Sequence, residues 1–181
     1  MRLRPYRKHE DDARLIELVR ESTDSCDSAL KPDDYRLMIS NRLAHELEAI
    51  DSDTSTTIIV AVADDSNEIT QLANSSDMSG GKASNIVGFI KLDIVPNAVS
   101  TRPEGRISNL CVSKAFETDK ISEVLIQEAH HWAQRNGVYR LTIQLSASDE
   151  SAMSLYEQFH FQVASVIMDL SCAQPELQKR Q

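Results

Sequence analysis

The side chains that most often carry chemistry in proteins, cysteine and histidine, show no catalytic or metal-binding spacing in this chain. Cys26, Cys111 and Cys172 lack the spacing of a metal site or a redox pair, which predicts three reduced thiols and a cytoplasmic protein. His130 and His131 are adjacent on a predicted helix, so their side chains diverge by about 100°. They therefore cannot form the i, i+4 pair typical of a helical metal site, and we expect no metal.

The stretch best suited to position a ligand covers residues 106–161, where strands and helices alternate. Residues 107–112 predict a strand, 119–136 an amphipathic helix stopped by Asn-Gly, and 139–146 a second strand, which together form a βαβ unit. Such a unit brings the helix N-terminus to the carboxyl edge of the sheet. Unpaired N–H groups and the positive end of the helix dipole favour anion binding there.

The rest of the chain predicts the elements that hold this unit in place. We expect an edge strand over residues 3–6, helices over 10–22 and 32–50, strands over 56–63 and 86–95, a turn region over 96–105, a short helix from Ser148 or Asp149 to residue 159, and a last strand or hairpin over 161–170. Residues 64–85 are rich in Ser, Asn, Asp and Gly, which predicts a mobile loop. This loop is either a tolerated insertion or a lid or partner-binding segment. The tail over 171–181 is expected to fray.

Composition limits the classes of partner. A chain of 181 residues with 41% hydrophobic residues is long enough for one domain with a sizeable core. A net charge of -9 argues against nucleic acid, because binding to phosphates needs a basic face. The basic N-terminus has no apolar run after it and does not read as a secretory signal. No window reaches the roughly 18 apolar residues of a membrane span, so we expect no membrane partner.

Four segments resemble the GNAT N-acetyltransferase superfamily in their order and spacing. They are IVGFI (86–90), LCVS (110–113), EAHHWAQRNGVYRLTIQL (128–145) and SAMSLYEQFHF (151–161). The resemblance implies one α/β (α+β) domain over residues 1–170, with a mixed, mostly antiparallel sheet flanked by helices. It also implies transfer of an acetyl group from acetyl-CoA to a primary amine, and it allows a homodimer.

The same resemblance assigns roles to individual residues. The backbone of Leu110, Cys111 and Val112 would hydrogen-bond the pantetheine arm of coenzyme A like an added strand. Tyr156 matches the tyrosine that protonates the leaving thiolate, a step for which a phenol has suitable acidity; the alternative is that Tyr156 only packs in the core. Glu104 is a candidate general base, and its alternative is a solvated turn carboxylate.

One loop departs from the family pattern, which is Arg/Gln-x-x-Gly-x-Gly/Ala before the central helix. Glu117, Lys120 and Ser122 stand at its three defining positions, and Thr118 and Ile121 complete the predicted pyrophosphate-binding set. Without glycines the backbone cannot approach the phosphates as closely, and an acidic residue opposes an anion. This loop supports a second hypothesis, a GNAT-like pseudoenzyme that acts as a binding or regulatory module.

The end of the last predicted helix also departs from the pattern. His160 stands where the family usually has glycine. We therefore expect either unusual bulk or a backbone with positive φ at this position.

Overall fold

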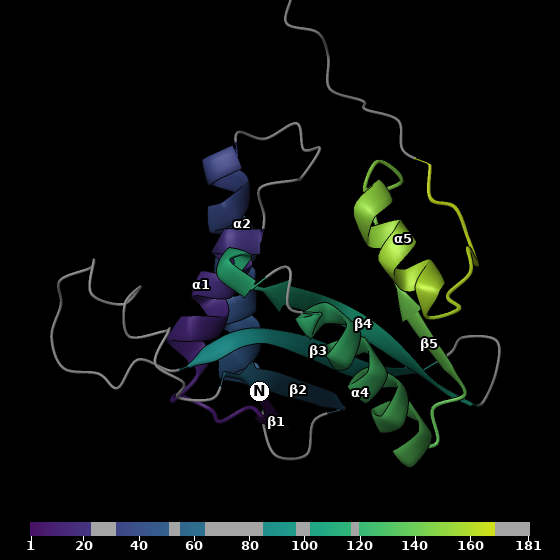
Figure 1. The fold of residues 1–181 in the computed structure, drawn as a ribbon, viewed down its shortest axis with the longest axis horizontal. Helices are drawn as coiled ribbons and strands as arrows, with labels where there is room; N and C mark the ends of the chain where they lie inside the picture. The colour runs from purple at the N-terminus through teal and green to yellow at the C-terminus, as the bar shows by residue number, and fades with distance from the viewer. Residues whose placement is uncertain (23–31, 51–54, 64–84, 97–101, 117–119, 169–181) are drawn as a thin grey trace, which may run out of the picture.

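In the described part of the chain, five strands form one sheet in the order β1-β2-β3-β4-β5, with helices on both faces (Figure 1). The computed structural model describes residues 1–22, 32–50, 55–63, 85–96, 102–116 and 120–168. The elements are β1 (Arg2–Pro5), α1 (Asp12–Ser22), α2 (Pro32–Ala49), β2 (Thr56–Val62), β3 (Ile86–Pro96), β4 (Pro103–Val112), a 3-10 turn (Lys114–Phe116), α4 (Ile121–Arg135), β5 (Arg140–Ile143) and α5 (Glu150–Gln158). Pairing is antiparallel from β1 to β4 and parallel between β4 and β5. The predicted mixed, mostly antiparallel sheet is confirmed.

The core has two parts because the central strands are apolar on both faces. In β3 the first seven residues are all buried, as expected for a strand covered on both sides. On one face, α1 and α2 pack on the sheet; this part of the core is Leu15, Leu18, Val19, Leu43, Leu47, Ile58, Val60, Ile86, Phe89 and Cys111. On the other face, α4 and Tyr156 of α5 pack with Ile59, Ala61, Val87, Ile90, Leu92, Ile107 and Val112.

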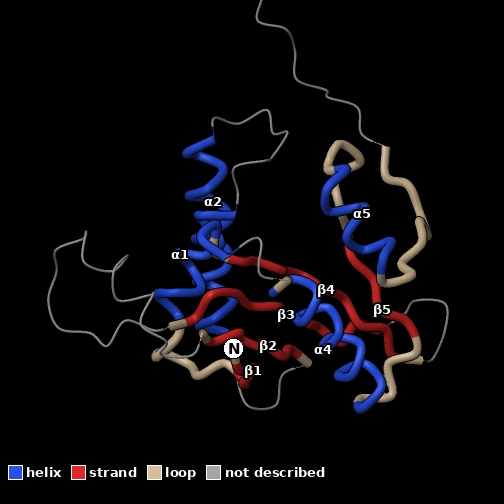
Figure 2. Tube along the Cα trace, in the orientation of Figure 1, coloured by secondary structure: helices blue, strands red, loops and turns tan. Residues whose placement is uncertain are grey.

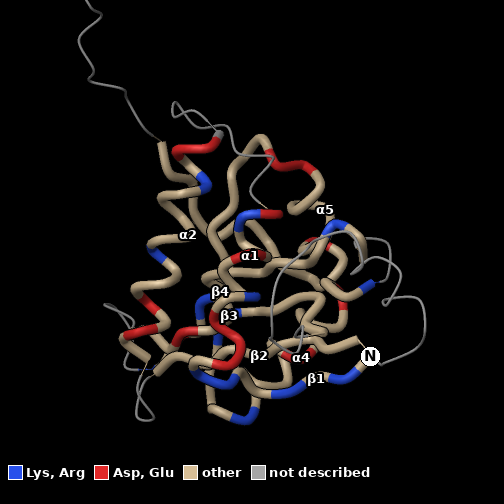
Figure 3. Tube along the Cα trace, turned by 90° about the vertical axis from the view of Figure 1, so that its left-hand side faces the viewer, with Lys and Arg blue, Asp and Glu red and all other residues tan. Residues whose placement is uncertain are grey.

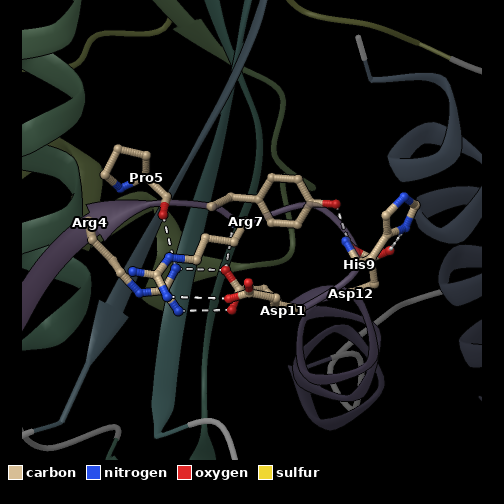
Figure 4. A network of polar contacts seen from close by, with 8 residues as sticks. Arg4, Pro5, Arg7, His9, Asp11 and Asp12 are labelled. Atoms are coloured by element: carbon tan, nitrogen blue, oxygen red, sulfur yellow. Dashed lines mark hydrogen bonds and ion pairs between the residues drawn. The ribbon is translucent and has the colours of Figure 1, made fainter. Parts of the chain in front are cut away.

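A polar network fixes β1 against the start of α1 (Figure 4). Asp11 is 2% exposed and accepts hydrogen bonds from both terminal nitrogens of Arg4, at 2.7 and 2.8 Å, and from the Arg7 N–H at 2.7 Å. Burial opposes ionisation of Asp11, but these hydrogen bonds outweigh it and hold its pKa below the usual value. The Tyr6 hydroxyl donates to Asp12 in the same network. The edge strand is thus tied to the helix that follows it.

Charged residues of both signs lie along α1 and α2 (Figure 3). One of them, Glu46 of α2, forms an ion pair with the sheet. Lys91 of β3 is 6% exposed, and its Nζ lies 3.2 Å from Glu46 of α2 and 3.0 Å from Asp93. The buried ammonium is therefore neutralised by two carboxylates. This arrangement joins α2 to the sheet.

Several predicted boundaries differ from the structure. The expected strand over residues 161–170 is wrong for residues 161–168, which leave α5 without forming a helix or a strand (Figure 2). The expected turn over 96–105 is shorter, because β3 includes Pro96 and β4 begins at Pro103. Apart from residue 85, the predicted loop over 64–85 lies outside the described residues, as does the tail.

Candidate active site

Strands β4 and β5 form a fork. They pair from Glu104 with Arg140 to Ile107 with Ile143, whereas β4 continues to Val112. Beyond Ile107, no described strand pairs with β4 on the β5 side, while its other edge stays paired with β3. The backbone N–H and C=O groups that alternate along this open edge can pair with an extended ligand. The predicted cofactor-binding residues Leu110, Cys111 and Val112 lie on this open part of the fork.

The N-terminus of α4 follows the open end of β4. The helix begins at Ile121, and Lys120 before it has φ 56° and ψ 22°. No side chain of the described residues caps this end, although the first N–H groups of any helix lack partners within the helix. These donors and the helix dipole make the turn suitable for an anion.

Gly88 of β3 allows α4 to start this close to the sheet. A Cβ atom at residue 88 would lie 2.9 Å from the Cys111 carbonyl oxygen and 3.2 Å from Cγ2 of Ile121. Any side chain there would push β3 away from β4 or the helix away from the sheet. The IVGFI motif contains this glycine, but its packing partners are distant in sequence and only the structure identifies them.

The altered loop keeps the backbone conformation for which glycine is suited. Lys120, at one of the two glycine positions of the family pattern, is in the left-handed region, which costs an L-residue about 1 kcal/mol. Ser122 lies in the first turn of α4, and the Ile121 side chain is buried in the core rather than facing a ligand. Glu117 and Thr118 lie outside the described residues.

Tyr156 of α5 is a buried phenol near the open end of the fork. The residue is 4% exposed, and its ring contacts Phe161 edge-to-face at a centroid distance of 5.3 Å. Burial raises the pKa of its hydroxyl, and the neighbouring Cys111 and Asp149 add to the rise. Among the described residues, the Tyr156 hydroxyl has no hydrogen-bond partner. The hydroxyl is therefore neutral at physiological pH.

The Cys111 thiol is unsuited to nucleophilic chemistry. It is buried on the α1 face of the sheet, where its Sγ lies 3.3 Å from the Ser22 Oγ. Burial raises its pKa to about 11, so the reactive thiolate is scarce at neutral pH. Cys111 therefore contributes its backbone, not its sulfur, to the open edge of β4.

Glu104 lies at the opposite end of β4. Cys111 is seven positions further along the strand, which corresponds to about 23 Å of extended chain. It is 8% exposed, accepts a hydrogen bond from the Tyr139 hydroxyl at 2.7 Å, and lies 2.6 Å from the Arg140 guanidinium. The alternative of a solvated turn residue is wrong, because β4 begins at Pro103 and includes Glu104. The structure does not bring Glu104 and Tyr156 together, so its geometry does not support the predicted role as general base.

Helix α4 carries both adjacent histidines. The rings of His130 and His131 are stacked with centroids 6.5 Å apart, and the His131 ring lies 3.5 Å from Glu128 on the same helix. Within the described ranges, His, Cys, Asp and Glu residues form no group of three that could hold a metal ion. None of the helices described is both long and apolar enough to cross a bilayer.

Comparison with known proteins agrees with this fork-and-helix arrangement. The model of the acetyltransferase (GNAT) family matches residues 32–161. The chain therefore belongs to the GNAT acetyltransferase family. No curated protein matches the chain.

Solved structures of low sequence identity share the fold along nearly the whole chain. A putative acetyl transferase from Pyrococcus furiosus is 17% identical with a TM-score of 0.67, covering 94% of this chain and 99% of its own. A ribosomal-protein-alanine N-acetyltransferase from Brucella melitensis biovar Abortus 2308 is 15% identical with a TM-score of 0.62 and the same coverage. An aminoglycoside acetyltransferase from an uncultured soil metagenomic sample is 17% identical with a TM-score of 0.60, covering 96% and 100%. At such identities the likeness concerns the fold alone.

Proposed function

We propose that this protein is an acyl-CoA-dependent N-acetyltransferase that transfers an acetyl group from acetyl-CoA to a primary amine. The observation that carries the proposal is the buried Tyr156 phenol, whose hydroxyl has no partner among the described residues and lies near the open end of the β4–β5 fork. Its hydroxyl oxygen is not among the fully buried polar atoms that lack a partner, so the ring is packed in the core while the proton stays within reach of a ligand. Family membership supports the same class of reaction.

Residues of β4, α4 and α5 would each bind or act on a different part of acetyl-CoA. The open backbone of Leu110, Cys111 and Val112 would bind the pantetheine arm, and the N–H groups at the start of α4 would bind the pyrophosphate, with Lys120 adding positive charge. Acetyl-CoA would supply the acetyl group as a thioester that an amine can attack directly. The C–N bond would form as the C–S bond breaks, and the amine would lose its extra proton to water. Tyr156, kept protonated by burial, would donate its proton to the departing sulfur and regain one from solvent.

The alternative, a binding module that no longer uses coenzyme A, rests on the acidic residues and missing glycines of the loop. The N-terminus of α4, which no described side chain caps, does not favour it, because the first N–H groups of the helix can still bind an anion. The acceptor amine is not indicated by the described side chains.

A calorimetric titration tests this proposal. Acetyl-CoA and acetyl-pantetheine, which lacks the pyrophosphate, are titrated separately into the folded protein at low and physiological salt. We expect acetyl-CoA to bind at micromolar strength and to weaken with salt, because its phosphates contact the helix N-terminus. Acetyl-pantetheine is expected to bind more weakly and without salt dependence. No binding of either compound at millimolar concentration would overturn the proposal.

A further inference from the structure

The fork opens at a β-bulge in β4. The register between β3 and β4 shifts between Lys91 and Leu92, and Ser108 of β4 is left with no residue of β3 opposite it. Pairing between β4 and β5 ends at Ile107, the residue before Ser108. An extra residue of this kind bends its strand and increases the local twist. The bend at Ser108 therefore coincides with the point where β4 and β5 run apart (Figure 1).

The side chain of Ser108 is held by Asp93 of β3. The Ser108 hydroxyl donates a hydrogen bond to Oδ2 of Asp93. The residue opposite Asp93 on β4 is Arg106, so Ser108 is a diagonal neighbour of Asp93, within reach of a side-chain contact. A hydrogen bond to a carboxylate is stronger than one between neutral groups. A side-chain contact thus joins β3 to the residue that the backbone register leaves without a residue opposite.

The Asp93 carboxylate is itself fixed from two other directions. Its Oδ1 accepts a hydrogen bond from the Thr56 hydroxyl of β2 at 2.6 Å, and the Lys91 Nζ lies 3.1 and 3.0 Å from its two oxygens. A carboxylate has about four acceptor sites, and these donors together with Ser108 occupy them. Burial opposes ionisation of Asp93, but the hydrogen bonds outweigh it and hold its pKa below the usual value. Asp93 therefore stays ionised and fully hydrogen-bonded, which suits an anchor and not a general base.

We propose that Asp93 and Ser108 are positioning residues for the acetyl-CoA site, because their contact fixes the bulge at which the fork opens. This inference rests on the proposed function. The predicted partners of the pantetheine arm, residues 110–112, follow the bulge in the same strand. A displacement of about 1 Å in a binding group can cost on the order of 100-fold in rate. Neither Asp93 nor Ser108 touches the ligand in this proposal, since both act through the backbone of β4.

The alternative is that these polar contacts only join α2 to the sheet. That link is made by Lys91, whose Nζ lies 3.2 Å from Glu46 of α2. Ser108 lies on the β4 side of Asp93, is exposed, and contacts neither end of this ion pair in the contacts given above. Loss of its hydroxyl leaves Lys91 between its two carboxylates. A change at Ser108 therefore separates the positioning of β4 from the attachment of α2.

Two variants each remove one hydroxyl from the same carboxylate. Ser108→Ala releases the bulge, whereas Thr56→Val releases β2, which does not pair with β4. We expect each to lower the Tm by about 2–4 °C, as for one lost hydrogen bond in a chain of this size. Only Ser108→Ala is expected to raise the acetyl-CoA dissociation constant in calorimetry, by about tenfold, because the backbone of β4 moves. Ser108→Thr keeps the hydroxyl and is expected to bind like the wild type.

Hydrogen exchange tests the same contact without a ligand. The amides of residues 109–112 are expected to exchange about tenfold faster in Ser108→Ala than in the wild type or Thr56→Val. Equal weakening of binding in Ser108→Ala and Thr56→Val, unchanged exchange in Ser108→Ala, or a Ser108→Thr variant that behaves like Ser108→Ala would each overturn the proposal. If the wild type binds no acetyl-CoA, the proposed function fails, whereas faster exchange in Ser108→Ala alone still supports the fixing of the bulge.

Discussion

Helix α4 has a residue in the left-handed conformation at each end, but the two ends are built differently. At its C-terminus this residue is Gly137, with φ 64°, preceded by Asn136, whose side chain donates to the Trp132 carbonyl oxygen at 2.8 Å. The Val138 N–H then donates to Ala133 at 2.9 Å. At its N-terminus the left-handed residue is Lys120, and no described side chain caps the helix.

The two ends of α4 are suited to different roles, the C-terminal end to stability and the N-terminal end to ligand binding. The C-terminal end uses the residue that adopts this backbone without strain and satisfies the last carbonyl groups. It leads to the closed end of the fork, where Glu104 joins Tyr139 and Arg140. The N-terminal end keeps a strained residue and has no side-chain cap among the described residues, features that proteins retain where a ligand compensates for them. Changes matched between the two ends therefore test which of them is functional.

The largest difference is expected when the same hydroxyl is removed near each end. Tyr156→Phe, at the open end of the fork, should lower kcat about 100-fold or more, because the proton donor is lost. Tyr139→Phe, at the closed end, loses a hydrogen bond to a carboxylate and should cost about 1–2 kcal/mol of stability, with kcat changed less than twofold. Steady-state kinetics and thermal unfolding of both variants measure this. Equal losses of kcat in the two variants would contradict the assignment of catalysis to the open end of the fork alone.

Adding a methyl group at two glycines is expected to give the next largest difference. Gly88→Ala should destabilise the fold by about 2 kcal/mol, because the new Cβ meets the Cys111 carbonyl oxygen at 2.9 Å and backbone must move. Gly105→Ala meets the end of the Leu141 side chain at the same distance, and that side chain can rotate, so we expect about 1 kcal/mol.

Denaturant unfolding of both glycine variants gives the two free energies. The acetyl-CoA dissociation constant should rise only in Gly88→Ala, because only this glycine sets the position of α4 at the open end. A larger loss of stability in Gly105→Ala would contradict the steric argument.

A smaller effect is expected from exchanging the two left-handed residues. Lys120→Gly should stabilise the fold by about 1 kcal/mol and Gly137→Lys should destabilise it by about as much, because only glycine adopts this backbone without strain. A Cβ atom at Gly137 would meet nothing within 4 Å, so the second cost is conformational alone. For a chain of this size, 1 kcal/mol moves the Tm by about 2–4 °C, which calorimetry resolves. No gain in Lys120→Gly would show that contacts of the lysine offset its strain.

The smallest effect is a spectroscopic difference at high pH. An ordinary tyrosine is half ionised near pH 10, whereas burial raises the pKa of Tyr156 above that value. Wild-type protein and Tyr156→Phe should therefore show the same phenolate absorbance at pH 10. Because the folded pKa is raised, the neutral buried phenol stabilises the fold below pH 10. This contribution is lost as the pH rises and the unfolded chain ionises. An additional phenolate in the wild type at pH 10 would contradict the burial of this hydroxyl.

Positions governed by local backbone geometry were predictable from the sequence. The Asn-Gly pair after α4 predicts a left-handed Gly137, which is confirmed. The replacement of glycine by His160 predicts bulk or a positive φ, and the structure has φ 64° there. Lys120 likewise stands at a glycine position of the family pattern, and its backbone has φ 56° in the structure. These predictions succeed because they depend on a residue and its immediate neighbours.

Positions that depend on partners distant in the chain were not predictable in the same way. Glu104 is buried because β4 begins earlier than its turn residues indicate, and because Tyr139 and Arg140 reach it from β5. Residues 161–168 have the pattern of a strand but no neighbouring strand in the described chain. A periodic pattern states how a segment can be buried, not which surface buries it.

The sequence by itself determined the order of helices and strands, the GNAT resemblance and the unusual residues of the loop, because periodicity and backbone preference are local properties. Only the tertiary structure decided that Glu104 and Tyr156 lie at opposite ends of the fork and that Gly88 sets the distance between β3, β4 and α4. It also decided that the apolar side chains of Val163, Val166, Ile167 and Met168 lie exposed. These features depend on strand register and packing, which bring together residues far apart in the chain.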